Sequence, residues 1–127
     1  MNCNCGSRKV YENCCEIAHK DITKVKTAEQ LMRSRYTAFT MANGDYLMES
    51  HHATTRPLTE KEDVVVWAKS VEWIKLEIKS VNKGLESDND GKVKFKAHFK
   101  EDGKQRFIKE NSKFIKENGV WYYLGLA

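Results

Sequence analysis

The sequence has no long apolar run. No stretch approaches the roughly 20 apolar residues that a membrane-spanning helix needs, so we expect no membrane span. The opening Met-Asn-Cys-Asn-Cys also lacks the basic segment and apolar core of a secretory signal, which favours a cytoplasmic protein. Because that compartment keeps thiols reduced, the four cysteines are expected to bind metal or do redox chemistry rather than form disulfides.

Proline occurs once, and the chain has no repeats, no Ser/Pro-rich linker and no low-complexity tract. With a length of 127 residues, these absences indicate one domain with at most a small appendage. An apolar fraction of 40% is enough to build a core. The net charge of +4 is mild and by itself identifies no partner.

Helical spacing is found in the first half of the chain. Thr27 followed three residues later by Gln30 is the pattern of a capping box, and it predicts a helix that ends at Asn43-Gly44. A short helix is expected to begin with Asp45-Tyr46-Leu47-Met48 and to run toward His51 and His52. A third helix is expected after Thr59, with Thr59 as its capping residue.

The period changes to two from Val71 onward. Ile74, Leu76 and Ile78 alternate with charged residues, and residues 92–100 alternate throughout, as in strands with one buried face. Three dipeptides indicate turns: Asp90-Gly91, Asp102-Gly103 and Asn118-Gly119. Helices followed by about four antiparallel strands predict an α+β fold, with a curved sheet wrapped on the helices and a pocket between them.

All four cysteines fall within the first fifteen residues. Zinc takes four soft or borderline ligands in a tetrahedron, and two close pairs joined by a loop supply them. Gly6 lets the chain reverse after the first pair, and Arg8 and Lys9 offset the charge of a four-thiolate site. The predicted zinc ligands are Cys3, Cys5, Cys14 and Cys15.

Other uses of the cysteines stay open at this point. Two disulfides conflict with the expected compartment, and C-x-C followed by a vicinal pair is not the usual C-x-x-C redox arrangement. His19 is an alternative fourth ligand in place of Cys15, because imidazole also binds zinc well.

The pattern Cys3-x-Cys5-Gly6-Ser7-x-Lys9-x-Tyr11-x-x-Cys14-Cys15 resembles the SEC-C motif, the zinc knuckle at the C-terminal tail of the SecA translocation ATPase. Asn4 stands where that motif usually has proline and Arg8 where it usually has glycine, and neither position is a ligand. Because the SecA knuckle serves partner contact, the resemblance implies the same use here.

Downstream segments resemble the YchJ family of small bacterial proteins. The matching stretches are Leu31-Met32-Arg33-Ser34-Arg35-Tyr36-x-Ala38-Phe39, Asp45-Tyr46-Leu47 and Glu117-Asn118-Gly119-x-Trp121-Tyr122-Tyr123. The resemblance implies a SEC-C-like zinc knuckle over residues 1–20 and a nuclear-transport-factor-two-like domain over residues 27–127. It also implies a cystatin-like cone and a bacterial cytosolic source, but no established activity.

Candidate pocket residues come from two segments. Ile108, Glu110, Ser112 and Phe114 share one strand face, so Glu110 and Ser112 need partners if that face is buried. Arg33 and Arg35 can supply them, either in a ligand-binding pocket or as a satisfied structural ion pair. The predicted pocket set is Arg33, Arg35, His52, Glu110 and Ser112.

No catalytic constellation stands out. His51 and His52 can act as acid and base at neutral pH, but adjacent histidines at a helix end are more often caps or surface residues, and no nucleophile or carboxylate pair accompanies them. Whether the protein is an enzyme is left open by the sequence, with a non-catalytic role favoured.

A basic strand face is the last candidate site. Its predicted members are Lys92, Lys94, Lys96 and Lys100, with Lys104 and Arg106 across a hairpin. Such a face suits a phosphate backbone, but no aromatic residue is expected among the lysines to stack on bases, so a solvated face is the simpler interpretation.

These observations favour a zinc-binding accessory or adaptor protein whose knuckle contacts a protein or ribonucleoprotein. The alternatives are a small-molecule binder or enzyme that uses the pocket, and an RNA-binding protein that uses the lysine face. Because cone-shaped domains of the resembling family often pair through their sheets, a homodimer is also admitted.

Overall fold

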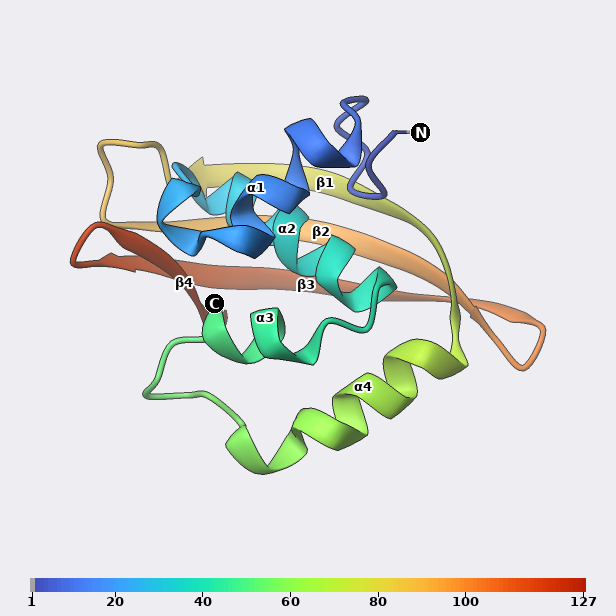
Figure 1. Ribbon diagram of the computed structural model, residues 1–127. Coiled ribbons are helices and arrows are strands. Elements are labelled where there is room, and N and C mark those ends of the chain that lie inside the picture. The colour runs from blue at the N-terminus through green and yellow to red at the C-terminus, as the bar shows by residue number, and fades with distance from the viewer. Residues whose placement is uncertain (1) are drawn as a thin grey trace.

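The computed structural model describes residues 2–127 as a layer of helices on a four-stranded sheet (Figure 1). The α-helices of this part of the chain are α1 (Cys15–Lys20), α2 (Ala28–Thr40), α3 (Gly44–Glu49) and α4 (Lys61–Ser70). The strands are β1 (Glu72–Lys83), β2 (Asp90–Glu101), β3 (Lys104–Glu117) and β4 (Val120–Leu126). Helices first and strands second give the predicted α+β class.

The sheet is an antiparallel meander in the order β1-β2-β3-β4. Asp102-Gly103 and Asn118-Gly119 form the β2–β3 and β3–β4 turns, with positive φ at all four residues, as the sequence predicted. The Asp90-Gly91 prediction is wrong, because both residues belong to β2 and pair with β3. The β1–β2 connection is instead the longer segment 84–89.

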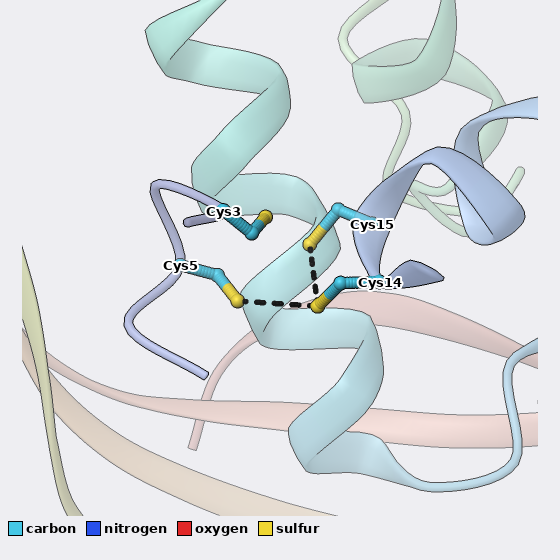
Figure 2. Close-up of side chains that lie close together, drawn as sticks. All are labelled: Cys3, Cys5, Cys14 and Cys15. Atoms are coloured by element: carbon cyan, nitrogen blue, oxygen red, sulfur yellow. Dashed lines mark hydrogen bonds between the residues drawn. The ribbon is translucent and has the colours of Figure 1, made fainter. Parts of the chain in front are cut away.

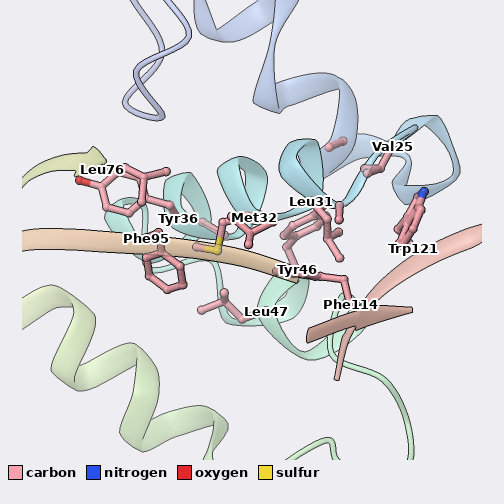
Figure 3. Packing of buried hydrophobic residues seen from close by; sticks show 14 of the residues in the cluster. Val25, Leu31, Met32, Tyr36, Tyr46, Leu47, Leu76, Phe95, Phe114 and Trp121 are labelled. Atoms are coloured by element: carbon pink, nitrogen blue, oxygen red, sulfur yellow. The ribbon is translucent and has the colours of Figure 1, made fainter. Parts of the chain in front are cut away.

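Helix α2 lies along the inner face of the sheet and supplies much of the core. Residues of β2 alternate as predicted, with Val93 and Phe95 buried and Lys92 and Lys94 exposed. Leu31 of α2 is fully buried (Figure 3). The central core residues are Leu31, Met32, Tyr36, Leu47, Leu76, Val93, Phe95, Phe114 and Trp121.

The start of α2 is capped as predicted. The Thr27 hydroxyl accepts a hydrogen bond from the Gln30 amide at 3.1 Å, while the Gln30 side chain reaches back to the Lys26 amide at 2.7 Å. The cap predicted at Thr59 is wrong. Thr59 lies in a 3-10 turn, and α4 begins after Glu60 without a side-chain cap. Helix α4 instead packs on α3, where Val65 lies directly over Gly44.

Strand β1 departs from strict alternation. The register with β2 shifts between Trp73 and Lys75 and again between Ile78 and Ser80. The first shift turns Ile74 outward, with 44% of its surface exposed, while Trp73 packs against the core. The prediction that Ile74 shares the buried face with Leu76 is therefore wrong.

Candidate metal centre

Four sulfur atoms converge at the N-terminal end of the molecule. The Sγ atoms of the four cysteines all lie within 4.8 Å of one another, with 3.6 Å between Cys5 and Cys14 and 4.0 Å between Cys14 and Cys15 (Figure 2). All four are free thiols. Zn–S bonds of about 2.3 Å in a tetrahedron place sulfurs about 3.8 Å apart, so the spacing fits a four-coordinate metal site.

Two short pieces of backbone bring the sulfurs together. Residues 2–10 form a loop closed by a bridge between Asn2 and Val10 and by a hydrogen bond of 2.7 Å from the Cys3 amide to the Lys9 carbonyl. Gly6 has φ +84°, a conformation that reverses the chain immediately after Cys5. Cys14 and Cys15 follow a 3-10 turn and begin α1.

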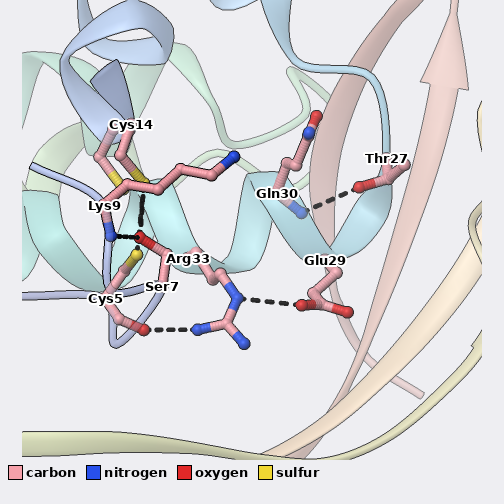
Figure 4. Close-up of polar contacts among 9 residues, drawn as sticks. Cys5, Ser7, Lys9, Cys14, Thr27, Glu29, Gln30 and Arg33 are labelled. Atoms are coloured by element: carbon pink, nitrogen blue, oxygen red, sulfur yellow. Dashed lines mark hydrogen bonds and ion pairs between the residues drawn. The ribbon is translucent and has the colours of Figure 1, made fainter. Parts of the chain in front are cut away.

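The knuckle, which we define as residues 2–20, is anchored on α2. The Arg33 guanidinium donates to the Cys5 carbonyl at 2.5 Å and to the Glu29 carboxylate at 2.9 Å (Figure 4). The Cys3 sulfur lies 3.6 Å from the Thr37 hydroxyl. Cys3, Cys5 and Cys15 are each less than 5% exposed, so the sulfurs are held between the knuckle loop and the helix.

The cluster favours negative charge on at least one sulfur. A hydrogen bond from Cys15 lowers the pKa of the Cys5 thiol to about 4, and the same bond raises the pKa of Cys15. Burial raises the pKa of Cys14, whose sulfur lies 3.1 Å from the Ser7 hydroxyl. Since metals bind thiolates, a shared negative charge among close sulfurs suits a divalent cation.

His19 is not part of the sulfur cluster. Its Nε2 lies 2.8 Å from the Ser34 carbonyl and its Nδ1 lies 2.8 Å from the Tyr11 hydroxyl. A carbonyl only accepts, so Nε2 carries the hydrogen and Nδ1 accepts from tyrosine. Burial lowers the pKa of His19, which agrees with this neutral form. Nε2 thus joins α1 to α2 and Nδ1 joins α1 to the preceding 3-10 turn, and the alternative of His19 as fourth ligand is not supported.

The predicted pocket residues divide between three places. Arg35, Glu110 and Ser112 line one cavity of about 190 Å³ between the helices and the sheet. Arg33 lies elsewhere, beside the knuckle, because two positions along a helix are about 200° apart around its axis. His52 is also outside the cavity, with Nε2 2.6 Å from the Glu117 carboxylate and Nδ1 2.7 Å from the Thr54 hydroxyl.

His51 is not among the residues that line the cavity either. Its ring packs edge-on against Tyr123 at 4.9 Å. Burial, with the nearby charges of Arg35 and Arg56, lowers the pKa of His51 to about 4. The imidazole is therefore neutral at physiological pH and serves packing.

The basic face is larger and less uniform than predicted. Residues paired directly across strands share a face, so Lys75, Lys109 and Lys113 join the lysines of β2. Arg106 does not lie on this basic face. It pairs with the buried Phe99 and so lies on the face of the sheet that is turned toward the helices. The sheet-face lysines are Lys75, Lys92, Lys94, Lys96, Lys100, Lys109 and Lys113.

An aromatic ring does lie among these lysines, contrary to the sequence-based expectation. Phe107 is 54% exposed, and the Lys96 ammonium lies 4.4 Å from the centre of its ring. Its position opposite His98 places it on the outer face of β3. The alternation of β3 could have predicted this exposure, because Phe107 is out of phase with Ile108 and Glu110 and therefore lies on the opposite face of the strand.

Sequence reasoning predicted the pocket between the helices and the sheet, but it missed the aromatic walls of that pocket and a second hollow of the surface. A groove of about 600 Å³ runs beside the knuckle and is lined by Arg8, Lys9, Ile17 and Lys24, among others. The cavity at Arg35 is walled by aromatic residues that had been assigned only to the core or to no site. Both depend on contacts between distant segments. Within residues 2–127, the structure contains no helix with the length and apolarity needed to cross a membrane.

The family model and the curated relatives that match this chain point to the same family. The family described as "YchJ, middle NTF2-like domain" matches residues 27–125. A UPF0225 protein of Vibrio parahaemolyticus is 42% identical over 125 residues, covering 97% of this chain and 72% of that protein. A UPF0225 protein of Vibrio vulnificus is 43% identical with the same coverage.

Two solved structures share the whole fold, knuckle included. A SEC-C motif containing protein from Rhodopseudomonas palustris superposes with a TM-score of 0.84 at 31% identity, covering 98% of this chain and 95% of that one. A second, from Psychrobacter arcticus, gives 0.81 at 26% identity, with coverages of 98% and 82%. The chain therefore belongs to the YchJ (UPF0225) family.

Proposed function

We propose that the protein is a zinc-binding accessory protein of the cytoplasm whose knuckle forms a contact surface for a protein or ribonucleoprotein partner. The observation that carries the proposal is the convergence of four reduced sulfurs within 4.8 Å. Four thiolates fill the tetrahedron of a zinc ion and leave no position for water or substrate, which is typical of structural rather than catalytic zinc. The likeness to SEC-C motif proteins supports the same assignment.

The groove beside the knuckle supports a role in partner contact. Arg8, Lys9 and Lys24 line it with positive charge, and Ile17, 47% exposed, adds an apolar contact point. Because the knuckle is hydrogen-bonded to α2, this surface is held in one arrangement relative to the domain. A partner segment that carries acidic residues and one apolar side chain fits these properties.

Metal content is the first test. Native mass spectrometry of protein purified from cells without added metal is expected to show one zinc ion per chain. The Cys3→Ser/Cys5→Ser variant is expected to lose it. Protein that is folded but free of stoichiometric zinc contradicts the proposal.

Partner contact is tested by reversing charge without touching a ligand. In affinity capture from the native cell, the Arg8→Glu/Lys9→Glu variant is expected to lose partners that the wild type retains, while it still binds zinc. Lys104→Glu, at the start of β3 and far from the knuckle, is a charge-reversal control. Identical partner sets for all three proteins refute a role for this surface.

RNA binding through the sheet is a second candidate function, favoured by Phe107 among the lysines. Exposed aromatic rings on a basic sheet surface stack on unpaired bases while lysines contact phosphates. Retention on single-stranded RNA is expected to fall steeply with salt and to be weakened by Phe107→Ala. No retention at low salt excludes it.

A further inference from the structure

The cavity between α2, α4 and the sheet has aromatic walls. Tyr36 and Phe39 come from α2, Trp67 from α4, Trp73 from β1 and Phe95 from β2. Ring centres of Trp67 and Trp73 are 5.4 Å apart at 89°, and those of Tyr36 and Trp73 are 5.8 Å apart at 83°. Such edge-to-face contacts fix the rings in place.

The polar atoms of the two tryptophans are already used. The indole N–H of Trp67 donates to the Glu101 carboxylate at 3.1 Å, and that of Trp73 donates to the Ala68 carbonyl at 3.1 Å. The two indoles therefore offer the cavity their rings rather than free hydrogen-bond donors. A ligand enclosed by them must have an apolar body.

Arg35 brings a positive charge to this apolar space. The side chain is only 7% exposed, and its Nη1 donates to the Leu47 carbonyl at 2.9 Å and to the Ser50 hydroxyl at 2.7 Å. Its Cζ lies 4.6 Å from the ring centre of Tyr123. Among residues 2–127, no acceptor is bound by Nε or Nη2 of Arg35. Burial lowers the pKa of Arg35 to about 10, so the group stays charged at neutral pH.

Glu110 brings a negative charge to the same cavity. Its carboxylate accepts a hydrogen bond of 3.1 Å from Ser112, and across the described chain it forms no ion pair within 4.0 Å, with Arg35 or any other cation. Burial and the Glu110 charge raise the pKa of the neighbouring Tyr123, which is neutral at physiological pH. The cavity thus holds one cation and one anion that are not bonded to each other.

An ion pair formed inside a largely apolar cavity is worth more than one formed in water, so a ligand gains affinity by pairing with the buried Arg35 or the partly buried Glu110. A neutral apolar molecule leaves both charges unpaired, and a molecule with one charge leaves the other. The volume of about 190 Å³ is below the roughly 300–1,000 Å³ typical of pockets for drug-sized ligands, so the occupant is small.

We propose that the cavity binds a small zwitterion with an apolar or aromatic body, which is the chemistry of a free apolar amino acid. Its carboxylate pairs with the free nitrogens of Arg35, its ammonium pairs with Glu110, and its side chain lies between Trp67, Trp73 and Tyr36. The site is separate from the knuckle and does not depend on the knuckle's role.

Three probes that share a phenyl ring test the proposal on the zinc-loaded full chain. L-Phenylalanine is a zwitterion, phenylacetate is an anion and phenethylamine is a cation. Calorimetry gives the affinity, and a change in tryptophan fluorescence, to which Trp67 and Trp73 contribute from the cavity and Trp121 from outside it, gives a second readout. L-Phenylalanine is expected to bind at least tenfold more tightly than either analogue, because each analogue pairs with only one of the two charges of the cavity.

Variants connect the binding to the cavity. Glu110→Gln is expected to weaken L-phenylalanine at least tenfold and not to weaken phenylacetate, which has no ammonium to pair with Glu110. Glu86→Gln, on the exposed β1–β2 loop, is the control and is expected to change neither. No binding of L-phenylalanine at millimolar concentration, or equal binding of the three probes by the wild type, overturns the proposal even if Glu110→Gln fails to fold.

Discussion

The Arg33 guanidinium donates a hydrogen bond of 2.5 Å to the carbonyl of Cys5, a residue of the sulfur cluster. The same side chain is held by Glu29 one helical turn earlier. One arginine thus connects the first helix of the α+β domain to the backbone of the knuckle. This contact helps to fix the position of the cluster relative to α2, together with the hydrogen bonds from Asn4 to Thr40 and from His19 to Ser34.

Removal of this contact is predicted to weaken metal retention. Arg33→Met keeps the aliphatic stem but loses the bond to Cys5, and groups that orient metal ligands typically contribute 10–100-fold to affinity. We expect about tenfold weaker zinc binding in competition with a chelator. Glu29→Gln keeps the Arg33–Cys5 bond and is expected to change affinity much less. Equal affinities for both variants contradict the anchoring role.

Metal removal is predicted to unfold the knuckle and spare the sheet. The buried cluster of the knuckle consists of cysteines with Tyr11 against it, too little apolar surface to fold unaided. After chelation, amide exchange is expected to become fast over residues 2–15 and to stay slow over β2 and β3. The Cys3→Ser variant is expected to show the same pattern without a chelator. A knuckle that stays protected after metal loss contradicts this account.

Gly91 is predicted to resist replacement although it lies in a strand. A Cβ at this position meets the Gly84 nitrogen at 2.6 Å, so the two chain segments approach too closely for a side chain. Gly91→Ala is expected to lower the free energy of unfolding by about 1–3 kcal/mol, as overpacked positions do. Glycine-to-alanine changes at unstrained sites stabilise instead, so the sign is diagnostic. Denaturant unfolding measures it, with exposed Lys92→Ala as control.

Features that depend on residues close together in the chain could be predicted from the sequence. The sulfur cluster lies within fifteen residues, and the cap at Thr27 depends on Gln30 three positions away. Gly91 is a residue for which local sequence gave the wrong prediction. Its dipeptide with Asp90 is identical in form to a turn, and only the distant partner Gly84 shows that a strand needs glycine there.

The cavity required information that local patterns do not hold. Helical spacing separates Arg33 from Arg35, but which of them faces the sheet depends on how α2 rests on it. The register shift next to Trp73 likewise exposes Ile74, which was expected to be buried, and packs Trp73 against the core instead. The aromatic walls of the cavity follow from both placements.

Acid is predicted to destabilise the fold in two separate windows. The pKa of His51 is lowered to about 4, so between pH 6.5 and 4 the unfolded chain binds more protons and the free energy of unfolding falls as the pH falls. His19, whose pKa burial also lowers, acts in the same direction. Hydrogen bonds from His98 and Lys79 lower the pKa of Glu77 to about 2, so its contribution is lost below pH 4.5.

Single substitutions separate these windows in urea unfolding followed from pH 7 to pH 2.5. His51→Gln is expected to flatten the dependence between pH 6.5 and 4, leaving the part that His19 contributes, and to leave the lower window unchanged. Glu77→Gln is expected to do the reverse. Because Glu77 is on the exposed sheet face and His51 packs on Tyr123 near Arg35, the two effects are expected to add in the double variant. A His51→Gln profile that parallels the wild type at every pH contradicts the assignment of the upper window to burial of this imidazole.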